Sequence, residues 1–131
     1  MILDTHAWLH YVGRGLSKVT VRRIERARVA GQLRVAAVTL WEVALLVHAR
    51  RLRLDGPVKE WLETALARSG VTVVPLDAAV AFESARLIDT LRDPADCQIV
   101  GTAIYLGAPL ATRDARILDA AEGLGIDVVE I

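Results

Sequence analysis

Residues 1–9 read MILDTHAWL, a short apolar run that ends at an aspartate and passes into a segment of mixed polarity. Similar apolar runs recur along the chain, each separated from the next by a longer segment. A run that is apolar through most of its length is typical of a strand covered on both faces of a sheet. We therefore predict strands over residues 2–4, 35–38, 71–76, 109–112 and 127–130.

The segments between these runs have helical character. Pro57 and Gly70 bracket one of them, as proline at the start and glycine after the end of a helix often do. We predict helices over residues 17–30, 39–50, 57–68, 77–91, 95–106 and 115–122. Alternating strands and helices indicate an α/β fold with a parallel sheet and helices on both faces. Ligands in such folds bind beyond the carboxyl ends of the strands, where the strand order reverses.

Length and composition limit the class of protein. A chain of 131 residues suits one domain, and we expect residues 1–131 to form it. Cys97 is the only cysteine, which excludes an internal disulfide and suits a reducing compartment. Polar residues interrupt residues 1–9 too early for a signal peptide, and no apolar run of about 18 residues is long enough to cross a membrane. These features predict a cytoplasmic protein that is not inserted in a membrane.

The charge is balanced overall but unevenly distributed. The 16 basic and 16 acidic residues cancel, yet residues 1–60 carry 11 basic and 5 acidic residues, and residues 61–131 carry 5 and 11. Arginines cluster near residues 22–34 and 50–53. Such clusters are equally typical of a solvated helix face and of a phosphate-binding surface.

Four acids, Asp4, Glu42, Asp96 and Asp114, fall where this architecture would place a site. Asp4 and Asp114 follow predicted strands, and Asp96 lies at the start of a predicted helix. Glu42 is the only acid in the apolar stretch 35–49, where an unpaired buried carboxylate costs several kcal/mol.

Each acid also has a purely structural explanation. Asp93, followed by Pro94 and then Asp96, is typical of a helix N-cap with an acidic first turn. Asp4 and Asp114 can cap the helices that follow them. Glu42 lies too far inside its helix to cap it, and its structural alternative is a salt bridge, for which Arg113 is a candidate.

The four acids together favour a metal site over four separate caps. Carboxylates that meet at one sheet edge repel one another unless a cation lies between them, and an oxygen-only ligand set selects Mg²⁺ or Mn²⁺. Phosphodiester hydrolysis uses such an ion directly. Setting these four acids aside leaves 12 acids against 16 basic residues, a surplus of +4 that would attract RNA. Single-stranded or looped RNA suits a shallow crevice of this kind.

The sequence also resembles the PIN domain family, specifically the VapC-type toxin ribonucleases. The matching motifs are LDTHA at residues 3–7, VTLWEVA at 38–44, DPAD at 93–96 with Ile99 and Thr102-Ala103, and LATRD at 110–114. They occur in the family's order over nearly the whole chain. One departure is Cys97, which follows the third acid where many relatives have arginine; we expect it to pack in the helix.

This resemblance implies a three-layer α/β/α fold with a five-stranded parallel sheet and an Mg²⁺- or Mn²⁺-dependent endoribonuclease. It implies that Asp4 and Asp96 hold the metal and that Glu42 and Asp114 complete the acidic pocket, giving four catalytic and metal-binding acids. Thr5 and Thr112 match hydroxyl positions that orient the acids, and Asp93 supports them. Homodimers and a cognate antitoxin that blocks the site are implied as well.

Two other functions remain open at this point. A protein-binding module of the same fold that has lost catalysis has no need to retain all four acids. A phosphate-accepting receiver domain also gathers acids at strand ends, but it needs a lysine near the site. Lys18 and Lys59 are the only lysines, and neither follows a late strand.

Overall fold

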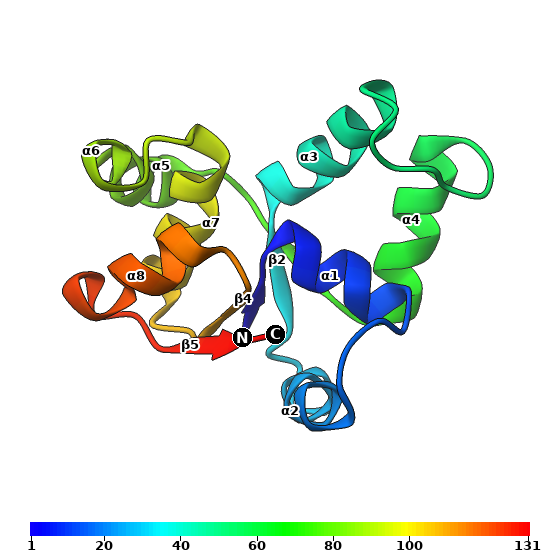
Figure 1. Ribbon diagram of the computed structural model, residues 1–131, viewed down its shortest axis with the longest axis horizontal. Coiled ribbons are helices and arrows are strands. Elements are labelled where there is room, and N and C mark those ends of the chain that lie inside the picture. Colours follow the sequence, from blue (N-terminus) through cyan, green and yellow to red (C-terminus); the bar gives the residue numbers. More distant parts are fainter.

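The computed structural model describes residues 1–131 and contains a five-stranded sheet in which all neighbouring strands are parallel (Figure 1). Its strands are β1 (Ile2–Leu3), β2 (Arg34–Ala36), β3 (Thr72–Val74), β4 (Leu110–Thr112) and β5 (Val128–Glu130), in the spatial order β3-β2-β1-β4-β5. The chain runs outward from β1 to β2 and β3 and then returns to the other side of β1 for β4 and β5. The strand order therefore reverses between β1 and β4.

Helices flank the sheet on both faces. They are α1 (Thr5–Val12), α2 (Lys18–Val29), α3 (Ala37–His48), α4 (Val58–Ser69), α5 (Ala78–Ala85), α6 (Ile88–Leu91), α7 (Pro94–Leu106) and α8 (Ala115–Leu124). Figure 1 shows α1, α2 and α4 on one side and α5 to α8 on the other, while α3 continues from the end of β2. None of these helices is both long and apolar enough to cross a membrane.

Side chains that alternate along the strands build two separate cores, because successive residues of a strand point to opposite faces. Leu3, Val35 and Ala111 are neighbours in the strand register and pack with buried residues of α1, α2, α3 and α4. Ile2 and Leu110 point the other way and pack with buried residues of α6, α7 and α8. Both faces of the sheet are thus covered, which explains why most residues of the strands are apolar.

The predicted α/β class and five-stranded parallel sheet are confirmed, while several boundaries were wrong. Asp4 lies outside β1 because it caps α1, and Val38 lies in α3 rather than in β2. The predicted helix over residues 77–91 is divided into α5 and α6, which are separated at Arg86 and Leu87. The helix α1 was not among the predicted ranges.

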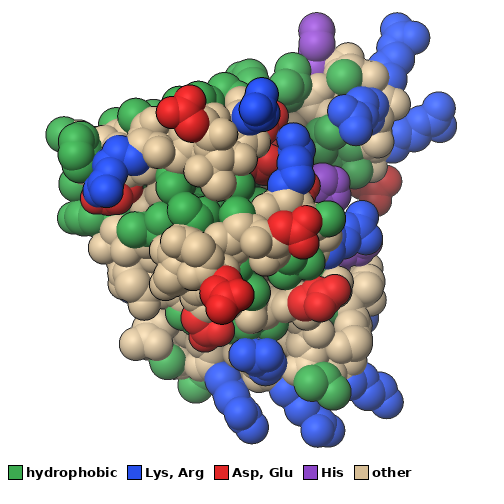
Figure 2. All heavy atoms as spheres, turned by 60° about the vertical axis from the view of Figure 1, so that its left-hand side comes forward, with side chains coloured by type: hydrophobic (Ala, Val, Ile, Leu, Met, Phe, Trp, Pro, Cys, Tyr) green, Lys and Arg blue, Asp and Glu red, His purple; other side chains and the backbone are tan.

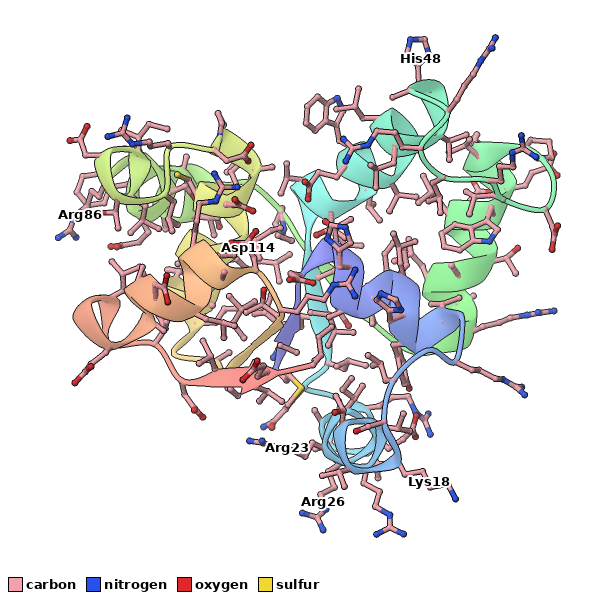
Figure 3. All side chains as sticks on the ribbon, viewed as in Figure 1. Lys18, Arg23, Arg26, His48, Arg86 and Asp114 are labelled. Carbon is pink, nitrogen blue, oxygen red and sulfur yellow. The ribbon has the colours of Figure 1, made fainter.

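Charge is distributed as the sequence predicted. Figure 2, turned toward the α5 to α8 side, shows acidic side chains across the front and lysine and arginine side chains along the lower edge. The lower edge is the region of α2, and Figure 3 shows its Lys18, Arg23 and Arg26 projecting away from the body of the molecule. Of the five basic residues of α2, only Arg28 forms an ion pair, with Glu25 at 2.8 Å.

A candidate acidic active site

A crevice of about 180 Å³ lies beyond the carboxyl ends of β1 and β4, where the strand order reverses. We call it the acidic crevice; it is lined by Asp4, Thr5, His6, Glu42, Asp93, Asp96, Ile99, Asp114 and Arg116. All four acids predicted from the sequence as site residues are among them, together with the supporting Thr5 and Asp93. Figure 3 places Asp114 centrally, between the two sets of helices.

Three of the aspartates are held in place by capping helices. Asp4 ends β1 and caps α1, with its Oδ1 accepting the Ala7 N–H at 2.6 Å. Asp114 caps α8, with its Oδ1 accepting the Ile117 N–H at 3.2 Å. Asp93 caps α7 through the N–H groups of Ala95 and Asp96, at 2.8 and 3.0 Å. The capping explanation is therefore correct for these residues, and it also fixes them at the rim of one crevice.

Glu42 reaches the crevice from a different kind of position. It lies more than one turn inside α3, which begins at Ala37, so it cannot cap that helix. Its Oε2 accepts a hydrogen bond from the Thr5 hydroxyl across the crevice. The alternative salt bridge to Arg113 is not formed.

The carboxyl groups are close enough to perturb one another. Burial is the main cause that raises the pKa of Asp4, which is only 5% exposed, and the Thr112 hydroxyl and Ala7 N–H oppose this rise. Burial likewise raises the pKa of Glu42, with the charge of Asp93 adding to it. Burial, then Asp93 and then Asp114, raise the pKa of Asp96 to about 6. The three shifts therefore reflect burial first, and the charges of neighbouring carboxylates add to it.

Thr112 holds the backbone of Asp114 in place at the end of β4. It is fully buried at the end of β4, and its Oγ1 accepts the Asp114 N–H at 3.0 Å. The predicted role of orienting an acid therefore fits its position. Cys97, one residue after Asp96, faces the core beside Ile99 and Val100, so the expected packing role is confirmed.

Sequence reasoning missed two residues of the crevice, His6 and Arg116. His6 is exposed and also lines the crevice. Arg116 extends from the first turn of α8, with its Nη2 3.6 Å from Asp96 Oδ2 and its Nε 3.9 Å from Asp114 Oδ1. The signal that could have identified Arg116 is its position two residues after Asp114, in the first turn of the helix that Asp114 caps.

The ligand chemistry of the crevice fits a hard divalent cation. Five carboxyl groups face one small space, and no cysteine lines it. Their present arrangement is not that of a preformed site, because no three His, Cys, Asp or Glu side chains are positioned to hold one ion. Thr5 engages Glu42 and Arg116 engages Asp96 and Asp114, so these side chains would have to turn toward an ion.

Comparisons with known proteins agree with this architecture. The family model described as the PIN domain matches residues 1–123. Ribonuclease VapC22 of Mycobacterium tuberculosis is 33% identical over 120 residues, which cover 89% of this chain and 88% of that protein.

Two solved structures share the fold at low sequence identity. VapBC2 from Rickettsia felis, bound to a DNA fragment from its promoter, has a TM-score of 0.73 at 14% identity, covering 99% of this chain and 97% of that one. DNA-bound VapBC from Salmonella typhimurium has a TM-score of 0.71 at 18% identity, covering 98% and 96%. With the family model spanning most of the sequence and the fold and acidic crevice in place, the chain belongs to the PIN domain family.

Proposed function

We propose that this protein is an Mg²⁺- or Mn²⁺-dependent endoribonuclease that serves as the toxin of a type II toxin–antitoxin pair. The observation that carries the proposal is that Asp4, Glu42, Asp96 and Asp114 line one crevice at the reversal of strand order. Its membership of the PIN domain family and its 33% identity to a protein named a ribonuclease support the same activity.

In this proposal, Asp4 and Asp96 hold the cation and Glu42 and Asp114 complete its surroundings. A bound divalent cation supplies the positive charge that polarises a phosphodiester and stabilises its leaving oxygen. Raised pKa values of Asp4, Glu42 and Asp96 mean that ionising all three is unfavourable without added positive charge. A divalent cation supplies that charge.

Supporting residues fix the direction of the carboxyl groups. The Thr5 hydroxyl holds Glu42, and the Thr112 hydroxyl holds the backbone of Asp114. Asp93 keeps the start of α7, and with it Asp96, at the rim of the crevice through its capping hydrogen bonds. The Asp93 and Thr112 contacts limit the motion of the backbone that carries Asp96 and Asp114 before any ligand binds, which lowers the entropic cost of binding, whereas Glu42 would have to turn away from Thr5 to reach an ion.

RNA is the substrate favoured by charge and access. The crevice is open to solvent and small, which suits a looped or single-stranded backbone better than a duplex. The unpaired basic residues of α2 and the arginines at 50–53 offer phosphate contacts elsewhere on the surface.

The proposed biological setting includes a protein partner. Several solved structures that share the fold are VapBC complexes, in line with a cognate antitoxin for this chain. We further propose that the protein forms homodimers and acts in the cytoplasm. Pull-down of a co-expressed product of the adjacent gene, followed by sedimentation of the complex, tests both the partner and the oligomeric state.

The direct test of the activity is cleavage of RNA by the purified protein with Mg²⁺ or Mn²⁺ and with EDTA. We expect cleavage only with the cation, and its loss in Asp4→Asn and Asp96→Asn. Asp119→Asn is the matched control, because Asp119 is an exposed aspartate on α8 outside the crevice. Cleavage by Asp4→Asn at the wild-type rate would refute the proposal.

The same experiment separates the proposal from a catalytically silent binding module. That alternative gains some support from the absence of three acids already positioned around one point. A silent module would show no cation-dependent cleavage in the wild type and no difference between Asp96→Asn and Asp119→Asn.

A further inference from the structure

Arg116 is the only lysine or arginine that lines the acidic crevice. Its guanidinium faces two of the five carboxyl groups there, Asp96 at 3.6 Å and Asp114 at 3.9 Å. One arginine against five carboxyl groups leaves most of the negative charge in the crevice uncompensated. Arg116 is therefore a partial neutraliser of this site in the absence of other cations.

Structural duties do not account for this arginine. It occupies the first turn of α8, where a positive charge opposes the helix dipole. Asp114 already accepts the N–H groups of Arg116 and Ile117, so it does not need the guanidinium to satisfy its capping role. The two ion pairs are long and engage separate carboxylates, unlike the short bidentate pairs that fix arginine in a structural role.

The side chain of Arg116 is also free to move. It is 64% exposed, whereas the side chain of its partner Asp96 is 18% exposed. Both contacts are long, at 3.6 and 3.9 Å, and the guanidinium end is solvated, so breaking them costs little free energy. The guanidinium can leave the carboxylates by rotation of its own side chain, without any change in α8.

We propose that Arg116 exchanges partners during the reaction cycle: it pairs with Asp96 and Asp114 in the cation-free protein, and it binds a phosphate of the RNA once a divalent cation has taken its place. The exchange follows from competition, because the guanidinium pairs with Asp96, which holds the cation in the proposed function, and with Asp114, which completes the surroundings of that cation. Once displaced from the two carboxylates, the planar guanidinium remains at the rim of the crevice, where its N–H groups can bind a phosphate. This inference rests on the proposed function for the identity of the phosphate-bearing substrate.

The proposal predicts effects of opposite sign for Arg116→Gln. Loss of the competing guanidinium should tighten Mn²⁺ binding, measured by calorimetric titration of the full chain, about three- to tenfold. At saturating Mn²⁺, loss of the phosphate contact should raise the KM for RNA cleavage by a similar factor with kcat little changed, as expected for an interaction made equally in the ground and transition states. Arg116→Lys keeps the positive charge without the planar guanidinium, so its Mn²⁺ affinity and its KM should lie between those of wild type and those of Arg116→Gln.

Arg113→Gln is the matched control. Arg113 is an exposed arginine next to Asp114 that forms no ion pair, so its replacement changes the net charge equally. We expect its Mn²⁺ affinity to stay within about twofold of wild type.

Three results would overturn the proposal: an unchanged or weaker Mn²⁺ affinity of Arg116→Gln, an equal gain in Arg113→Gln, or an unaltered KM. If the wild type cleaved no RNA, the proposed function would fail, and the partner exchange onto RNA would fail with it. Normal cleavage by wild type together with unchanged Mn²⁺ affinity and KM in Arg116→Gln would overturn the exchange alone.

Discussion

Replacing Asp96 by asparagine should stabilise the cation-free protein while it removes activity. The pKa of this carboxyl group rises from 3.8 to about 6, first because of burial and then because of Asp93 and Asp114. Each pKa unit corresponds to about 1.4 kcal/mol, so ionising Asp96 in the folded protein costs at most about 3 kcal/mol. The carboxyl group retains access to water and its pair with Arg116, and screening reduces the expected gain in Asp96→Asn to about 1–2 kcal/mol.

The sign of the pH dependence follows from the direction of the shift. Because the folded-state pKa lies above the ordinary value, the folded protein binds more protons than the unfolded chain between pH 3.8 and about 6. The contribution of Asp96 to wild-type stability is therefore most favourable below this window and is lost as the pH rises through it. The advantage of Asp96→Asn should be full above about pH 7 and should vanish toward pH 3.8.

Thermal unfolding in EDTA at neutral and acidic pH measures this difference. At neutral pH the melting temperature of Asp96→Asn should exceed that of wild type by about 3–8 °C. Asp119→Asn, the exposed control, should match wild type at both pH values. Adding Mn²⁺ should then stabilise wild type and leave Asp96→Asn nearly unaffected. A variant no more stable than wild type at neutral pH, or a gain that persists unchanged at acidic pH, would refute the reasoning.

Two further predictions concern packing and alkaline stability. A Cβ at Gly101 would lie 2.8 Å from the backbone of Ser84, so Gly101→Ala should destabilise the protein by about 1–3 kcal/mol. Gly123 has open space around it, so Gly123→Ala should stabilise the protein by up to about 1 kcal/mol. Equal denaturation midpoints for the two variants would contradict the close packing of α5 against α7. Burial and then a hydrogen bond to Glu25 raise the pKa of Tyr11 to about 12, so the tyrosine favours the folded state below pH 10 and this contribution is lost between pH 10 and about 12. Across that window the free energy of unfolding of Tyr11→Phe should fall less than that of wild type, as measured by denaturant unfolding at a series of pH values. If the free energies of unfolding of the two proteins fell in parallel with pH, the effect would be excluded.

Strands were predictable because both faces of the sheet are buried. An apolar run such as 109–112 can be identified from the sequence without knowing which strands it pairs with. All five predicted runs coincide with strands to within a few residues. The boundary between β2 and α3 was not predictable, because Ala36 caps the helix with no side-chain hydrogen bond. Val38, a β-branched residue, extended the apparent strand into what is the first turn of α3.

The division between α5 and α6 was hidden for a related reason. Phe82, Ala85 and Ile88 keep helical spacing through the break at Arg86 and Leu87, so periodicity gave no sign of it. Periodicity reports which residues share a face and is insensitive to a short irregular turn that preserves that face.

The site itself could be predicted to the level of its acids. Asp4 and Asp114 follow strands that are neighbours in the sheet, and their carboxyl groups meet because parallel strands end at one edge. Spacing places Arg116 two residues after Asp114, but its pairing with Asp96 was not predictable, since that pair joins two helices whose relative orientation appears only in three dimensions. Likewise, the Thr5 to Glu42 hydrogen bond depends on the packing of α1 against α3.

Anomalous diffraction from a crystal of the protein soaked in Mn²⁺ tests the central claim most directly. A peak in the crevice, with oxygens of Asp4 and Asp96 at coordination distance and the guanidinium of Arg116 withdrawn from them, is the result we predict. A manganese peak elsewhere on the molecule, or none despite an accessible crevice, would contradict it.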